Sequence, residues 1–198
     1  LFFFFYSILM ATVDITPTNI VLARMDSYGN PYSNFGNNGI VETSIVGKYN
    51  FSGGETLLLT EDNKILLAAT TPNSSPTKFS VFRFFLDGSL DTTFGTGGRT
   101  DIAFSSSDVS YDMTLDYNGK ILLVGKGGSE SGLIRLNSDG TPDTTFAPDG
   151  KFTLDLSIGN GSNYLRTCLP LSNGDILAAG FDYTSNSGDF VAVKLTQN

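Results

Sequence analysis

Aspartates in turns are the residues of this chain whose spacing could do chemistry. Asp87 and Asp91 lie four residues apart, and Asp139 and Asp143 repeat that spacing further along the chain. Carboxylates beside glycine-rich turns suit a hard cation such as calcium. The residue pattern of a complete calcium-binding loop is absent, however, and Asp in a turn commonly accepts hydrogen bonds from its own backbone. The sequence therefore favours a structural role, and calcium is the one cofactor left open.

One basic residue recurs in each of four similar apolar segments, and these residues are Arg24, Arg83, Arg135 and Lys194. Two arrangements would give them a role. They could converge on a central channel and bind an anion, or each could pair with a turn aspartate of its own unit. We favour the pairing, because the basic residues and the turn aspartates both recur along the chain.

Ordinary catalytic machinery is missing from the sequence. The chain has no histidine, which is the commonest general base and metal ligand, and Ser131 has no evident base beside it in the sequence. Pairs of aspartates could serve glycoside hydrolysis, but the same positions recur in several units, which favours a scaffold role. From these features we predict that the chain is not an enzyme.

Composition narrows the class of protein further. The chain has 198 residues, of which 40% are hydrophobic and only 16% are charged, so it can build a core. Its net charge of -8 argues against binding to nucleic acid, which needs a basic surface. The single cysteine, Cys168, excludes an intrachain disulfide and is expected to be buried.

Three repeated sequence motifs indicate where the strands and turns lie. Phe35, Phe94 and Phe146 each lie four residues before a glycine, in NPYSNFGNNG, SLDTTFGTGG and TPDTTFAPDG. A second motif, seen as EDNKILLAAT, DYNGKILLVG and LSNGDILAAG, predicts hairpins with type I′ turns. The third motif is the apolar segment with one basic residue that is described above. Each unit then has four strands, so we predict an all-β, propeller-like repeat protein of about four four-stranded units.

The spacing of these motifs divides the chain into units. The predicted boundaries give units of about 1–52, 53–105, 106–159 and 160–198 within a single repeat domain. The first strand of the first unit would have to lie within or before LFFFFY, and the last unit ends after its third strand. We therefore expect the first and last units to be incomplete.

The chain resembles the delta-60 repeat family, whose units are regarded as propeller-like. The residues that carry the resemblance are LDGSLDTTFGTGGRT at 86–100, YNGKILLVG at 117–125 and SDGTPDTTFAPDGKF at 138–152. The first copy is looser, because Tyr32 stands where the others have Asp91 and Asp143. The resemblance implies a secreted or cell-surface protein with tandem units.

The apolar start of the chain predicts an assembly device. Residues 1–10 form an apolar segment that is too short to span a bilayer. This segment could add as a strand to the incomplete last unit, within one molecule or between neighbours, so self-association into a ring or filament is expected. The predicted donor residues are Leu1, Phe2, Phe3, Phe4, Phe5, Tyr6, Ile8 and Leu9. The predicted acceptor edge comprises Phe190, Val191, Ala192, Val193 and Leu195.

Two functions therefore stand side by side at this stage. The first is an extracellular structural protein that polymerises head to tail by strand donation. The second is a cell-surface module that recognises a glycan or protein through its loops, with tyrosines as stacking surfaces. These tyrosines are Tyr28, Tyr32, Tyr49, Tyr111, Tyr117 and Tyr183. Candidate N-glycosylation sites are Asn50, Asn73 and Asn160.

Overall fold

The computed structural model is all-β over the residues that it describes, as the sequence predicted. The described residues are 7–13, 19–46, 56–71, 76–156, 161–184 and 187–196. Across these ranges no helix is long and apolar enough to cross a membrane. The strands are β1 (Ser7–Val13), β2 (Asn19–Asp26), β3 (Ile40–Val46), β4 (Thr56–Leu59), β5 (Ile65–Thr71), β6 (Lys78–Phe84), β7 (Arg99–Ile102), β8 (Val109–Leu115), β9 (Ile121–Gly127), β10 (Glu130–Leu136), β11 (Lys151–Leu154), β12 (Ser162–Pro170), β13 (Ile176–Thr184) and β14 (Ser187–Leu195). A short 3-10 turn, η1 (Pro148–Gly150), precedes β11.

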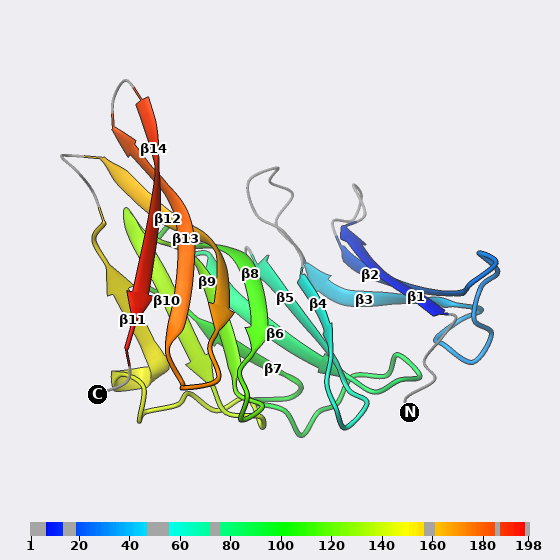
Figure 1. Ribbon diagram of the computed structural model, residues 1–198. Helices are drawn as coiled ribbons and strands as arrows, with labels where there is room; N and C mark the ends of the chain where they lie inside the picture. Colours follow the sequence, from blue (N-terminus) through cyan, green and yellow to red (C-terminus); the bar gives the residue numbers. More distant parts are fainter. Residues whose placement is uncertain are drawn as a thin grey trace.

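Four antiparallel sheets follow one another along the chain (Figure 1). Among the described residues, the second and third sheets have four strands, β4 to β7 and β8 to β11, whereas three strands belong to the first sheet, β1 to β3, and three to the last, β12 to β14. Figure 1 shows the first and last sheets at opposite sides of the array. Successive four-stranded sheets that pack face to face are the blades of a propeller. The prediction of an all-β, propeller-like repeat protein is confirmed.

The hairpin turns differ from the expected type I′ geometry. The turn between β4 and β5 is closed by the Asn63 N–H, which donates to the Thr60 carbonyl at 3.0 Å. Asn63 has a positive φ of 61°, but Asp62 before it does not. Gly119 and Gly174 repeat the arrangement in the later hairpins, with φ of 73° and 89°. A type I′ turn needs positive φ at both central residues, so these hairpin turns are not type I′, and each has one left-handed residue after the central pair.

The repeated phenylalanine joins one sheet to the next. Phe94 follows the second sheet's third strand, and its side chain is fully buried among residues of the second and third sheets, including Ile121 and Leu136. The next residue, Gly95, donates its N–H to the Asp139 carbonyl of the following unit at 2.8 Å. Phe35 makes the same connection between the first and second sheets. The recurring motif that contains this phenylalanine therefore connects one blade to the next.

Three apolar clusters fill the spaces between successive sheets. In the second sheet, Phe82 and Phe84 pack toward the first sheet, whereas Leu66 and Val81 pack toward the third. This division follows from the strand pleat, which sends alternate side chains to opposite faces. Each middle sheet is consequently apolar on both faces and buried on both.

Candidate binding site

The recurring basic residues pair with turn aspartates in the two middle units. Arg83 Nε lies 2.8 Å from Asp91, and Arg135 Nε lies 2.7 Å from Asp143. Both aspartates are buried. Burial alone raises the pKa of Asp143, but hydrogen bonds from Lys120 and from the Thr145 side chain and backbone outweigh it and hold that pKa well below its usual value. These groups stabilise the turns, as the pairing hypothesis predicted.

In the first and last units the recurring basic residue has a different partner. In the first unit Tyr32 replaces the aspartate, and the Arg24 guanidinium lies 4.2 Å from the centre of its ring. Arg24 also donates to the Leu86 carbonyl at 3.1 Å. In the last unit Lys194 lies 2.8 Å from Asp175, a residue of the hairpin turn. A cation–π contact and a relocated carboxylate thus stand in for the repeated ion pair.

Asp87 and Asp139 accept hydrogen bonds from residues of their own turns. Asp87 accepts hydrogen bonds from the Ser89 N–H at 2.9 Å and its hydroxyl at 2.6 Å. Asp139 accepts the same pair from Thr141. These contacts lower the pKa of both carboxyl groups, led by the bond from each hydroxyl. Within the described ranges no three acidic, cysteine or histidine residues gather as a metal site would require.

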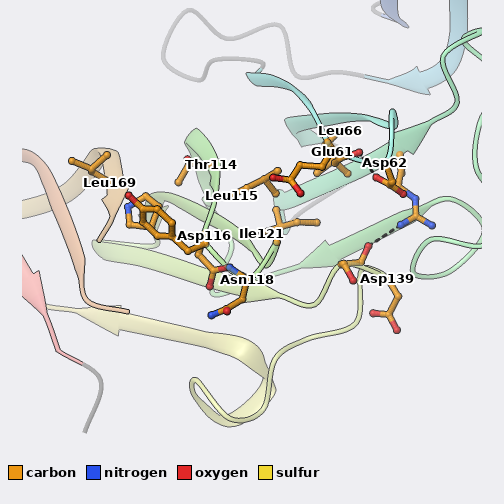
Figure 2. Close-up of a pocket in the computed structure, with 16 residues that line it drawn as sticks. Glu61, Asp62, Leu66, Thr114, Leu115, Asp116, Asn118, Ile121, Asp139 and Leu169 are labelled. Carbon is orange, nitrogen blue, oxygen red and sulfur yellow. Dashed lines mark hydrogen bonds between the residues drawn. The ribbon is translucent and has the colours of Figure 1, made fainter. Parts of the chain in front are cut away.

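An open cleft of about 900 Å³ lies where the hairpin ends of three units meet. Figure 2 shows Glu61 and Asp62 on one side of it and Leu169 on the other, with Asp116 and Asn118 between them. Its size is within the range of ligand pockets in proteins. The full lining is Thr60, Glu61, Asp62, Leu66, Arg83, Thr114, Leu115, Asp116, Tyr117, Asn118, Gly119, Ile121, Ser138, Asp139, Leu169 and Pro170.

Polar groups at the rim of the cleft differ in how much of their bonding capacity is in use. Asp116 accepts from the backbone N–H groups of Asn118 and Lys120, and so is part of its turn. The Arg83 guanidinium donates to the Ser138 carbonyl at 2.7 Å in addition to its ion pair. Glu61, by contrast, makes no hydrogen bond or ion pair with another described residue, so its carboxylate can accept from a ligand.

The tips of the three hairpins carry different side chains at one repeat position. Counting back from the first isoleucine of β5, β9 and β13, that position holds Glu61, Tyr117 and Ser172. Tyr117 lines the cleft with 72% of its surface exposed. Positions that repeat hold the scaffold together, whereas this one is free to vary among the units. The tip side chains are therefore the best candidates for contact with a ligand.

The other predicted tyrosines are dispersed. Tyr28 is 89% exposed in a turn of the first unit, and Tyr32 lies against Arg24. Tyr111 contacts Tyr164, with ring centres 5.3 Å apart, and Arg166 covers the Tyr111 ring at 4.0 Å. Tyr49 lies outside the described residues. Tyr117 is the only described tyrosine that lines the cleft. The other described tyrosines therefore form no common stacking surface with it.

The predicted assembly residues fall in two groups. Leu1 to Tyr6 lie outside the described residues, as do Asn50, Asn73 and Asn160. Ile8 and Leu9 belong to β1 and pair with Met25 and Arg24 of β2. The predicted acceptor residues lie in β14, which pairs with β13 and is the last strand in the described order of its sheet.

Comparison with known proteins supports the fold. Residues 60–94 and 118–146 match the family described as "Domain of unknown function (DUF5122) beta-propeller". The match supports a propeller-like repeat family and covers less than half of the chain. No curated protein matches.

A solved structure, the endo-arabinase from Bacteroides thetaiotaomicron VPI-5482, is also similar. It has 13% sequence identity and a TM-score of 0.48, over 94% of this chain and 73% of that chain. This likeness to an enzyme corrects the expectation that the chain is not one, and that expectation is withdrawn. At this identity and TM-score the likeness assigns no activity to the chain.

Proposed function

We propose that this chain is a propeller-like binding module that takes a hydroxyl-rich ligand, such as a glycan, in the cleft at the hairpin ends. The observation that carries the proposal is the open cleft in which Glu61 and Tyr117 stand at one repeat position of adjacent units. A carboxylate accepts hydrogen bonds from hydroxyl groups, and an exposed tyrosine ring packs against the apolar face of a sugar. The ring and the carboxylate together would orient such a ligand.

We also propose that the protein is secreted or displayed at the cell surface and belongs to the delta-60 repeats. The resemblance of residues 86–100, 117–125 and 138–152 to that family supports both statements. Asn50, Asn73 and Asn160 would then be available for glycosylation in a eukaryotic source.

A glycan array probed with the labelled chain tests the proposed ligand class. We expect retention of a subset of glycans, and we expect Tyr117→Ala to reduce that binding about fivefold or more, since stacking on one aromatic ring contributes on the order of 1 kcal/mol. Tyr28→Ala is the matched control, because Tyr28 is also an exposed turn tyrosine but does not line the cleft. Retention of no glycan, or equal loss in both variants, would contradict the proposal.

A second candidate function is assembly by strand addition at the edge of β14. The order of the last sheet supports it, because β14 has one paired neighbour in the described part of the chain, and edge strands recruit further strands. The donor would come from Leu1 to Tyr6, because Ile8 and Leu9 already pair within the first sheet. Loss of self-association on deletion of residues 1–6 would support strand addition, and unchanged association would contradict it.

A further inference from the structure

A second pocket lies where the first unit meets a turn of the second unit. It has a volume of about 760 Å³ and is lined by residues within 33–42 and by residues 87–89. None of these residues lines the cleft at the hairpin ends. Its size is within the range of ligand pockets in proteins. We call it the junction pocket, and it is separate from the site proposed above.

Two aliphatic side chains give the junction pocket an apolar surface. Val41 lies between the turns of the two units, since a Cβ atom at Gly36 would be 2.5 Å from its side chain and one at Gly88 would be 2.4 Å from it. Glycine at both positions therefore lets the two turns approach Val41 closely. Ile40, the next residue along the lining, is 46% exposed. A ligand in the pocket would meet these side chains with an apolar face of its own.

The polar side chains of the junction pocket keep much of their bonding capacity. Asn34, Asn37 and Glu42 make no side-chain hydrogen bond or ion pair with another described residue. The hydrogen bonds that Asp87 accepts from Ser89 both go to Oδ1, which leaves Oδ2 for another donor. An amide group donates and accepts hydrogen bonds, and a carboxylate accepts them. Together these groups match the hydroxyl groups of a ligand, which also donate and accept.

The junction between the second and third units shows that the fold does not require these free groups. Thr93 and Asp101 occupy the repeat positions of Asn34 and Glu42 there. The Thr93 hydroxyl donates to a carboxylate of its own turn at 2.6 Å, and Asp101 accepts from the Ser80 hydroxyl at 2.7 Å. The same positions thus bond within the protein at one junction and are available to a ligand at the other. Function in a repeat fold resides in such departures from the common scaffold.

A backbone carbonyl at the junction pocket lacks the donor that its repeat equivalent has. At the later junction the Thr100 hydroxyl donates to the Gly140 carbonyl at 2.6 Å. Val41 and Gly88 occupy these two repeat positions, and valine has no hydroxyl group. The Gly88 carbonyl accepts no hydrogen bond from any other residue that the structure describes. A hydroxyl group of a ligand can donate to it.

The charge of the junction pocket disfavours an acidic ligand. Two carboxylates, Glu42 and Asp87, belong to its lining, and no lysine or arginine stands among the described residues that form it. A carboxylate or phosphate group of a ligand would therefore meet like charge without a compensating cation. The remaining polar side chains are uncharged amides and hydroxyls, which suit an uncharged ligand.

We propose that the junction pocket binds an uncharged, hydroxyl-rich ligand, such as a neutral sugar. The amides of Asn34 and Asn37 hold the ligand hydroxyl groups, and Ile40 packs against the apolar face of the sugar ring. Glu42 accepts a further hydroxyl hydrogen. The site shares no lining residue with the cleft and does not depend on Tyr117, so the two sites bind independently.

Nuclear magnetic resonance titration of the isotope-labelled full chain tests the junction pocket. The probes are three neutral tetrasaccharides, namely cellotetraose, maltotetraose and xylotetraose. We expect at least one of them to cause saturable shifts of the amide signals of residues 33–42 and 87–89. Asn37→Ala should weaken that binding about fivefold or more, because it removes the hydrogen bonds of one amide group. Tetragalacturonate, which carries carboxylates, should cause no saturable shift of these signals.

Thr96→Ala is the matched control for Asn37→Ala. Thr96 occupies the repeat position of Asn37 at the later junction, is exposed, and lines neither the junction pocket nor the cleft. Its removal should leave the binding constant unchanged. Circular dichroism melting shows whether each variant is folded, and Asn34→Ala replaces Asn37→Ala if the latter unfolds.

The position of the shifted signals separates this proposal from that for the cleft. Tyr117→Ala should leave the shifts at the junction pocket unchanged. Shifts at the junction pocket without shifts at Glu61 and Tyr117 would support this site and contradict the cleft as a sugar site. The proposal would be overturned if none of the three neutral tetrasaccharides shifted the junction signals, or if Asn37→Ala bound as tightly as Thr96→Ala.

Discussion

Leu66 of the second sheet and Leu177 of the last occupy the same repeat position, yet they are 1% and 39% exposed. Phe79 and Phe190 differ more, at 1% and 86%. Leu66 and Leu177 each lie in a strand with a neighbour on both sides, so their difference comes from the third sheet, which covers Leu66. Phe79 also has β7 beside its strand, whereas β14 is the last strand in the described order of its sheet. The comparison shows that apolar burial in this molecule comes largely from contacts between neighbouring units, as in repeat proteins generally.

The largest expected effect comes from truncating the connecting phenylalanine between buried sheets. Phe94→Ala should lower the free energy of unfolding by about 3–5 kcal/mol, because the side chain is fully buried between the second and third sheets. Phe190→Ala on the outer face of the last sheet, the side turned away from the third sheet, should change it by less than about 0.5 kcal/mol, as expected of an exposed site. Urea denaturation of both variants at low protein concentration measures the difference, and equal losses would contradict the comparison.

Asp143→Asn should have the next largest effect. The change leaves the buried Arg135 guanidinium without its carboxylate and should cost about 3 kcal/mol. Asp175→Asn in the last unit should cost less than about 1 kcal/mol, because its partner Lys194 is half exposed. Chemical denaturation of both variants at neutral pH checks this order.

The effect of Asp143 also depends on pH in a defined direction. Its pKa in the folded chain is lower than in the unfolded chain, so its stabilisation is complete above the ordinary aspartate pKa of about 4 and is lost as the pH falls further toward the folded value. The difference in unfolding free energy between wild type and Asp143→Asn should therefore be constant near neutrality and shrink in acid. A difference that grows on acidification would show that the ion pair is not its source.

Glycine substitutions compare the occupied and open sides of the units. Gly140→Ala should cost about 2 kcal/mol or more, since φ is 87° and the new Cβ would lie 2.8 Å from Phe94. Gly29→Ala has a similar φ of 83° but no atom within 4 Å, so only the backbone cost of about 1 kcal/mol remains. Thermal melting of the two variants separates backbone strain from contact, and identical shifts would remove the evidence that Phe94 packs on Gly140.

The smallest effect concerns the thiol on the buried side of the last sheet. Burial, aided by the charge of Asp112, raises the pKa of Cys168 to about 12, so the thiol should not react with iodoacetamide at pH 8 in the folded chain. A cysteine introduced by Phe190→Cys lies on the exposed outer face and should react readily. Mass spectrometry counts the labels; rapid labelling of Cys168 in the native protein would show that the sheet does not shield it.

Much of this architecture could be predicted because the sequence repeats. The spacing of Phe35, Phe94 and Phe146 fixed the register, and the recurring Arg and Asp residues predicted the ion pairs of the middle units. Other features depend on contacts between distant residues. The contact of Arg24 with Tyr32 and the pairing of Lys194 with Asp175 replace an ion pair by groups that no local pattern marks.

The candidate site was only partly visible in the sequence. Tyr117 was one of several tyrosines, and its place beside Glu61 in the cleft depends on how adjacent hairpins meet. The exposure of Leu177 and Phe190 could not be predicted either, because a strand pattern shows that they are apolar but not which residues pack over them. Their repeat equivalents Leu66 and Phe79 are buried, so the repeat alone would have predicted burial.

Hydrogen exchange tests most directly whether contacts between neighbouring sheets stabilise the molecule. In Phe94→Ala we predict faster exchange in the second and third sheets than in the wild-type chain, because this side chain is buried between them, and in Phe190→Ala we predict no change in either sheet. Exchange in Phe94→Ala that equals that of the wild-type chain would contradict the account.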